Sequence, residues 1–324
     1  MDPLALLRSS AAVNTRGQLR RQVPAAAIVF LIAALLASGA PARSPSPGRV
    51  LRWAEGLKGV ELTLLVLTVA AVSLFLQPVL NYIADVLKGA SPSPGSRLSR
   101  LLNPLRYRRR REIEYQRQRL QELASRIHGG DSTSEETAEF SALDVALSRW
   151  PARYEYVLPT ALGNLLAAVD DYPELRYGMD VRVTLPRLRS VAPPEVNKQL
   201  DDQLDDLQFS IELAAALILG AGASACLLAS HPLWLLLPIC VLLLAWLAYR
   251  NALAAGVQYG EGVRVLFDLY RFRLYEALRM QLPDGVEAEK EANKEMTLWL
   301  WRGFDPGISY HHPLPPPGQA ASGS

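Results

Sequence analysis

Histidine and cysteine are scarce in this sequence, and their scarcity excludes two kinds of site. Of 324 residues, four are histidine and two are cysteine. The histidines have no cysteine, histidine or acidic partner at metal-ligand spacing, so we expect no metal site. Cys226 and Cys240 flank a tight turn at depths that differ by about 7 Å at helical rise, too far for a relaxed disulfide. We expect both to be small buried side chains.

Sequence motifs for catalysis are also missing. We find no phosphate-binding loop, no nucleophile elbow, and no kinase or dinucleotide fingerprint. An enzyme would have to work with Asp, Glu, Arg or Tyr alone. We therefore expect a protein without catalytic activity and without a bound cofactor.

A strong excess of charge of either sign is absent as well. The chain has 34 basic and 32 acidic residues, which gives a net charge of +2. Whole-chain charge therefore predicts no polyanionic partner, and we expect no binding of nucleic acid. Half of the residues are hydrophobic and a fifth are charged, a mixture that fits membrane spans attached to a sizeable aqueous part.

Long apolar runs are what the chain does have. They cover residues 24–40, 60–84, 209–230 and 232–249. Each is about as long as a helix that crosses a hydrocarbon core of roughly 30 Å, so the sequence predicts a multi-pass membrane protein. Residues 1–42 also resemble a secretory signal, with a basic lead and small residues after the apolar stretch. Cleavage there is the alternative, and it would leave the topology of the remaining chain unchanged.

Basic residues predict the orientation of these spans. The densest cluster, Arg97 to Arg111, follows the second run, whereas the turn at His231 has no Lys or Arg. Cytoplasmic flanks are enriched in Lys and Arg, so this pattern predicts that both termini are in the cytoplasm. The abundance of Arg, Ala, Leu and Pro, a usage common in bacteria with GC-rich genomes, suggests that the membrane is a bacterial inner membrane. Four basic residues between the first two runs argue weakly against it. They are Arg43, Arg49, Arg52 and Lys58.

The segment after the second run predicts an amphipathic helix from Asn103 to Ile127. Its apolar positions are Ile113, Leu120, Leu123 and Ile127. Four consecutive arginines, Arg108, Arg109, Arg110 and Arg111, lie next to the membrane. We expect them to bind anionic lipid headgroups, with nucleic acid as the weaker alternative.

The next stretch predicts a linker followed by a short helix. Residues 128–139 are small, polar and acidic, which is typical of a flexible linker. Pro159 and Thr160 predict a helix start, and Tyr172, Pro173 and Gly178 predict its end.

A group of residues between Leu158 and Leu188 forms a motif of the type LPTxLGN…RYGxD…PRL. Its members are Leu158, Pro159, Thr160, Leu162, Gly163, Asn164, Arg176, Tyr177, Gly178, Asp180, Pro186, Arg187 and Leu188. The motif resembles a segment of uncharacterised bacterial multi-pass membrane proteins. The resemblance covers about forty residues; it implies a membrane architecture and brings no known activity.

Five polar residues in and near this motif form the candidate polar cluster. They are Asn164, Asp170, Arg176, Asp180 and Arg187. We expect a buried ion-pair network that clamps this region; an exposed site for a ligand or partner is the alternative. The aspartates between Asp201 and Asp206 predict a solvated acidic face in preference to a cation site.

The last two runs are expected to continue as long helices outside the membrane. A helix from Pro193 leads into the third run, and an aromatic-rich stripe follows the fourth run down to Pro283. Small residues at four-residue spacing, Ala216, Gly220 and Ser224, predict close packing against the fourth run, with a homo-oligomer contact as the alternative.

The fold class that follows is an all-α membrane protein in which two transmembrane hairpins flank a mostly helical cytoplasmic domain. The expected segments are a lead (1–23), a first hairpin (24–87), a juxtamembrane helix and linker (88–139), a helical domain (140–208), a second hairpin (209–250), a helical extension (251–303) and a disordered Pro-rich tail (304–324).

Two functions remain after these exclusions. The first is an interaction, signalling or scaffold component whose cytoplasmic module contacts a protein partner. The alternative is an oligomeric channel or transporter subunit, which needs polar side chains inside the spans. Few side chains meet this requirement, namely Ser73, Gln77, Asn81 and Ser224. The small number of polar side chains inside the spans favours the first function.

Overall fold

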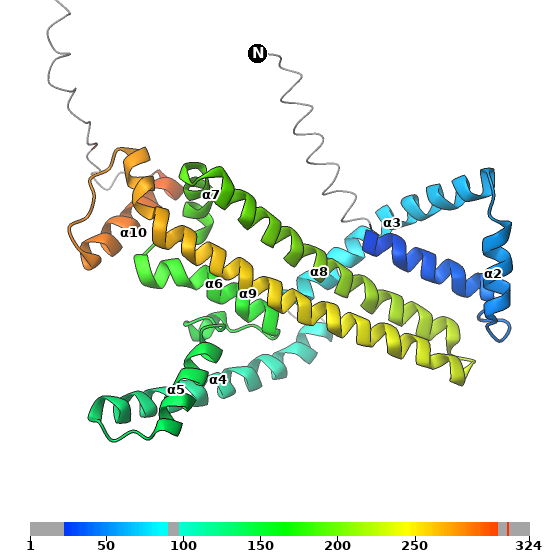
Figure 1. Cartoon of the computed structure of the whole chain (residues 1–324), viewed down its shortest axis with the longest axis horizontal. Helices are drawn as coiled ribbons and strands as arrows, with labels where there is room; N and C mark the ends of the chain where they lie inside the picture. Colours follow the sequence, from blue (N-terminus) through cyan, green and yellow to red (C-terminus); the bar gives the residue numbers. More distant parts are fainter. Residues whose placement is uncertain (1–22, 90–96, 304–309, 311–324) are drawn as a thin grey trace, which may run out of the picture. The chain divides into compact units, whose positions relative to one another are not determined.

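The computed structural model describes residues 23–89, 97–303 and 310, and within these ranges the regular secondary structure is helical (Figure 1). The helices are Val23–Ser38, α2 Pro47–Gly56, α3 Val60–Leu87, α4 Arg97–Gly129, α5 Ser134–Leu147, α6 Ala161–Tyr177, α7 Val181–Val191, α8 Pro194–Leu228, α9 Leu236–Leu278 and α10 Val286–Arg302, with short 3-10 turns at Tyr154–Tyr156 and Pro232–Leu235. The expected all-α class is confirmed. The predicted tail, apart from Tyr310, lies outside the described residues.

The chain divides into two compact units. Of the described residues, the membrane unit comprises 23–89, 97–109, Leu158–Gly163 and Asp202–Val257. The helical unit comprises Arg110–Val157, Asn164–Asp201, 258–303 and Tyr310.

Among the described residues, three helices are long and apolar enough to cross a membrane, which supports a membrane protein. They are α3, α8 and the continuous segment Pro232–Leu278 that contains α9. The first apolar run forms the shorter helix Val23–Ser38, about 24 Å long at helical rise.

The small residues of α8 pack against this first helix. Ala25 and Ile28 share a core with Ala216, and further along Leu35 shares a core with Leu228. A Cβ added at Gly220 would lie 3.6 Å from Ile28. The helix Val23–Ser38 therefore packs against the small residues of α8, a contact that was not expected from the sequence.

Side chains of α3 are far less covered than those of α8. In the most apolar 18 residues of each helix, 6% of the residues are buried in α3 and 44% are buried in α8.

Both cysteines are free and exposed, so the expectation that they are buried was wrong. In a spanning helix an exposed apolar side chain can face lipid tails, which are as apolar as a protein core.

Arg49, at the start of α2, binds backbone carbonyls at and just after the end of the first helix. Arg49 of α2 donates from Nε to the carbonyl oxygen of Ser38 at 2.6 Å, and its guanidinium also donates to the carbonyl of Ser44. A cation at a helix C-terminus is favourable, because the last carbonyls carry partial negative charge.

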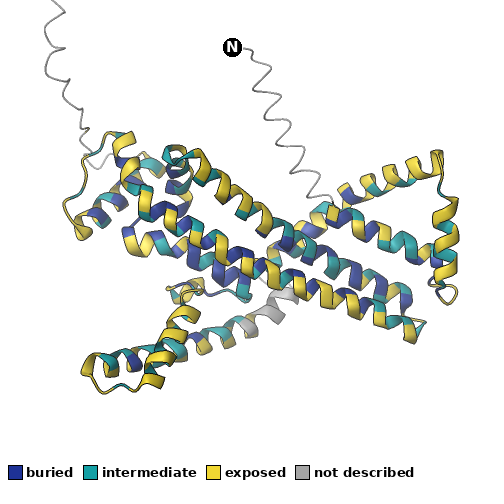
Figure 2. Ribbon diagram, viewed as in Figure 1, coloured by how far each residue is buried: buried dark blue, intermediate teal, exposed yellow. Residues whose placement is uncertain are grey.

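Helices α6, α7, α9 and α10 build the core of the helical unit. Met179, Leu188, Phe267, Tyr275 and Met296 are almost fully buried there. Dark blue segments of α9 mark buried residues of this helix in Figure 2. The predicted continuation of the fourth run therefore exists, and its aromatic stripe forms this core.

The expected linker at 128–139 is mostly helical. Helix α4 runs to Gly129 and α5 begins at Ser134, where Thr133 and Glu136 form a capping box. The carboxylates that suggested a solvated linker pair with α4: Glu139 with Arg119 at 2.9 Å, and Glu136 with Arg126. Acidic residues in the first turn of a helix are favourable, so this composition marked a helix start.

Helix α6 ends just before Gly178, one of the residues expected to end it, and not at Tyr172 or Pro173. It continues to Tyr177 with Pro173 inside, and Gly178 then adopts a φ of +74°. A Cβ at Gly178 would lie 2.6 Å from the carbonyl oxygen of Lys290, so glycine is required for both its φ and the close approach of α10.

Candidate functional site

Two polar clusters emerge from the structure, and the first lies in the helical unit. Tyr172 and Tyr177 of α6 both donate hydrogen bonds to Asp268 of α9, at 2.9 Å and 2.6 Å from Oδ1. The guanidinium of Arg271 lies 4.4 Å from the ring centre of Tyr177. These four residues are the tyrosine–aspartate cluster.

The cluster extends to α10 through two further contacts. Arg271 Nε donates to Glu289 at 2.6 Å, and both side chains are largely buried. Asn293 accepts from Tyr275 Oη at 2.6 Å and donates to the carbonyl oxygen of Tyr177 at 2.7 Å. Three helices are thus joined by charge-assisted and buried hydrogen bonds.

Protonation of the tyrosines fits a structural role. Burial raises the pKa of Tyr172 and of Tyr177, and the hydrogen bond to Asp268 raises both further. A phenol with a raised pKa remains a donor at neutral pH and offers no phenolate for proton abstraction. We interpret the cluster as a clamp between helices.

The five residues of the candidate polar cluster lie in different local settings. Asp180 caps α7 by accepting from the Arg182 amide at 2.7 Å, and Arg187 donates to the carbonyls of Val183 and Leu300. Asn164 is buried, whereas Asp170 and Arg176 are exposed. The hydrogen bonds just given therefore do not gather these five residues at one site.

A neighbouring residue takes the ion-pair role that was expected for Asp170. Asp171, 4% exposed, accepts from Arg153 Nε at 3.1 Å, and Arg153 also pairs with Glu174. Asp170 and Asp171 are adjacent, and the phase of helix α6 decides which of them is buried.

The arginine run Arg108–Arg111 spreads around α4, because consecutive helical residues differ by about 100°. Arg110 lies 4.8 Å from the ring centre of Tyr154 and donates to the carbonyl of Glu155 at 3.2 Å. Arg108 and Arg111 are exposed and three residues apart, so they share a face.

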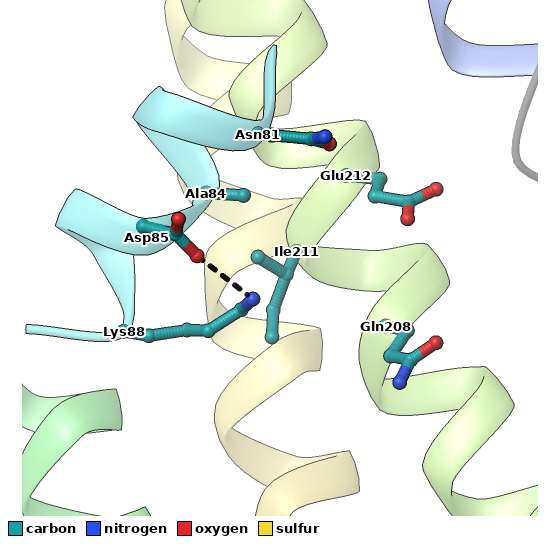
Figure 3. Close-up of a pocket in the computed structure, with 7 residues that line it drawn as sticks. All are labelled: Asn81, Ala84, Asp85, Lys88, Gln208, Ile211 and Glu212. Carbon is teal, nitrogen blue, oxygen red and sulfur yellow. Dashed lines mark hydrogen bonds and ion pairs between the residues drawn. The ribbon is translucent and has the colours of Figure 1, made fainter. Parts of the chain in front are cut away.

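The second cluster is a polar pocket in the membrane unit, between the end of α3 and α8 (Figure 3). Its volume is about 300 Å³. The lining residues are Asn81, Ala84, Asp85, Lys88, Gln208, Ile211 and Glu212. This set is the polar pocket below.

Local geometry on α3 sets the charges of the polar pocket. Lys88 Nζ lies 3.2 Å from Asp85 Oδ1, one turn away, and Asn81 accepts from Gln77 Nε2 at 3.1 Å. From the sequence, Asn81 was noted only as one of the few polar side chains inside a span. No local signal indicates that Glu212 and Asp85, which are far apart in sequence, line one cavity.

The LPTxLGN motif holds the end of α3. A Cβ at Gly163 would lie 2.5 Å from the carbonyl oxygen of Lys88, and one at Gly89, whose φ is +86°, would lie 3.0 Å from Thr160 Oγ1. The amide of Leu162 donates to Tyr249 Oη of α9 at 3.2 Å. Leu158–Gly163 belong to the same compact unit as the end of α3, and their close approach positions Lys88.

Metal binding has no support in the described part of the chain, where no three His, Cys, Asp or Glu residues lie close enough to share an ion. Comparison with known proteins finds no matching protein-family model, and no curated protein or solved structure that is similar to the chain.

Proposed function

We propose that this protein is an inner-membrane interaction or scaffold component, with both termini in the cytoplasm, whose helical unit binds a protein partner. The observation that carries the proposal is an apolar stripe on α9, formed by Val265, Leu269 and Phe272. All three are exposed, and Leu269 is 66% exposed. Their spacing of four and three residues places them on one face of the helix.

Helix length supports a position of this stripe outside the hydrocarbon. Helix α9 has 43 residues and is about 65 Å long, whereas crossing the membrane takes about 20 residues. If residues 232–250 cross, Val265 lies about 20 Å beyond them along the helix axis. Exposed apolar residues that face neither core nor lipid mark a contact surface for another protein.

Packing of the first helix supports the proposed topology. It follows α8 from Ala216 to Leu228 in the same chain direction, which fits a fourth crossing that starts in the cytoplasm. Arg49, bonded to the carbonyl of Ser38, is one of the basic residues that argued against this orientation. Arg108 and Arg111, on one exposed face of α4, are the arginines we assign to anionic lipid headgroups.

Site-specific photo-crosslinking in native membranes tests the stripe. A photoreactive residue at position 269 should form an adduct with one protein, whereas the same residue at position 282 should not. Leu282 is the matched control, because it is an exposed leucine of the helical unit outside the stripe. Leu269→Glu should abolish the adduct formed from a probe at Val265. Adducts of position 269 with lipid alone, or equal adducts at both positions, would contradict the proposal.

A second candidate, an oligomeric channel subunit, is favoured by one observation. Ser73, Gln77, Asn81 and Asp85 follow each other at four-residue spacing along α3. Such a stripe could line a path if several copies faced each other. Liposomes that contain the purified protein should then conduct ions, and Asn81→Leu should remove this ion flux. Absence of ion flux through liposomes with the wild-type protein would exclude this function.

A further inference from the structure

We infer that the polar pocket binds a phosphoethanolamine headgroup, a zwitterion with a primary ammonium and a phosphodiester. The inference rests on the membrane unit alone and does not depend on the proposed function. It goes beyond the lipid contact assigned to α4, because it concerns a cavity with charges of both signs.

The position of the polar pocket along the spans points to the headgroup layer. The apolar helix α3 ends at Leu87 and Lys88 follows it directly. Helix α8 is acidic up to Asp206 and apolar from Leu213 onward. Both helices therefore change from apolar to polar at the height of the cavity, as spans do where hydrocarbon meets headgroups.

The walls of the cavity match the two ends of the zwitterion. Lys88 supplies an ammonium that can donate to phosphate, whereas Asp85 and Glu212 supply carboxylates that can accept from the ligand's ammonium. The amides of Asn81 and Gln208 can serve either end. Ala84 and Ile211 add an apolar wall where the glycerol end of a lipid would enter.

The same charges disfavour other headgroups. A choline headgroup cannot donate hydrogen bonds to carboxylates and is typically held by aromatic rings, which are absent from the lining given above. A headgroup with phosphate but no amine would meet two carboxylates and one lysine. A bare divalent cation would meet the Lys88 ammonium, already 3.2 Å from one of the two carboxylates.

Cavity size fits a headgroup and not a whole lipid. Its volume of about 300 Å³ is at the lower end of ligand sites, which range over about 300–1,000 Å³. The acyl chains would remain in the bilayer.

Native mass spectrometry and thermal melting of the full-length detergent-solubilised protein test the inference. Dioleoyl phosphatidylethanolamine should be retained and should raise the melting temperature more than phosphatidylcholine or phosphatidylglycerol with the same chains. Asp85→Asn and Glu212→Gln should each weaken retention about tenfold or more, because each removes a charge-assisted hydrogen bond. Glu61→Gln, the same change in the first turn of α3, is the control and should retain the lipid.

Soluble glycerophosphoethanolamine separates the two sources of this headgroup. Competition with the lipid would show that the headgroup alone is recognised, whereas retention of the lipid in its presence would show that the chains contribute to a lipid site. Equal retention of the three lipids by the wild-type protein would overturn the inference without any variant. Equal loss in Glu61→Gln and Glu212→Gln would overturn it as well.

Discussion

Among the described glycines, Gly163 is the one whose added Cβ would lie closest to another atom. Its Cβ would lie 2.5 Å from the backbone oxygen of Lys88, and backbone cannot move as a flexible side chain can. We expect Gly163→Ala to destabilise the membrane unit by about 1–3 kcal/mol, as overpacking does. Thermal melting followed by circular dichroism measures this effect.

Gly222→Ala is the matched control for this prediction. Gly222 also lies inside a helix, and nothing lies within 4 Å of its added Cβ. This variant should melt at or above the wild-type temperature, because alanine favours helix more than glycine does. Equal melting temperatures of Gly163→Ala and wild type would contradict the predicted contact.

The two tyrosines of the tyrosine–aspartate cluster predict an alkaline limit to stability. Their folded pKa values are raised by burial and by Asp268, whereas in the unfolded chain a tyrosine titrates near pH 10. The native state then binds protons more tightly than the unfolded state. The stabilisation that the two protonated tyrosines give the folded protein is therefore complete below about pH 10. It is lost as pH rises through their folded pKa values.

Ultraviolet titration measures this effect through tyrosinate absorption, alongside circular dichroism. Tyr172→Phe with Tyr177→Phe should lower stability at neutral pH, because Asp268 loses both donors, and should flatten the decline above pH 10. An equally steep decline in the double variant would show that other groups cause it.

Residue chemistry was predicted from the sequence more reliably than residue position. A buried ion-pair network was expected among five residues from Asn164 to Arg187 that included Asp170, whereas the buried aspartate is Asp171, which pairs with Arg153. A two-residue run of aspartate carries no information on helix phase. The partners of Tyr172 and Tyr177 could not be predicted, because Asp268 lies 96 and 91 residues away in sequence.

At the scale of the element, the capping box stabilises the start of α5. Thr133 Oγ1 accepts from the Glu136 amide at 3.2 Å, and Glu136 accepts from the Thr133 amide at 3.0 Å. Thr133→Ala should cost about 1 kcal/mol and should raise hydrogen exchange across Ser134–Leu147. Thr137→Ala, four residues further along, should leave exchange near wild type, and equal exchange in both variants would deny the cap its role.

The long helices were predicted well, whereas the short helices α2 and α5 and several helix boundaries were not. The long helices were readable because apolar periodicity is local information. Pro173 misled the analysis, since the same residue type ends helices in most contexts yet lies inside α6 here. The acidic stretch before Glu139 misled it because first-turn carboxylates and linker carboxylates look alike in sequence.

At the scale of the whole molecule, the orientation of the spans remains the main prediction. In a Cys226→Ala and Cys240→Ala background, a cysteine at position 230 should react with an impermeant maleimide in intact cells. A cysteine at position 135 should react only after permeabilisation. The reason is the basic cluster after α3 and the turn without Lys or Arg. Labelling of position 135 in intact cells would reverse the topology.

Membrane architecture was predictable from composition, whereas assembly of the membrane unit was not. Run length and hydropathy indicate helices that can cross, and they say nothing about neighbours. Gly220 packs against Ile28, and Gly163 packs against Lys88. The residues of each pair are far apart in the sequence, so a local pattern does not predict these contacts.

The exposure of both free cysteines gives this molecule built-in reporters. Cys226 lies on α8 and Cys240 on α9, within one compact unit. A thiol that faces lipid tails is out of reach of charged reagents in water, whereas a probe that partitions into the bilayer can reach it. A pair of spin labels introduced this way would record the separation of the two helices in wild-type protein, with no engineered residue.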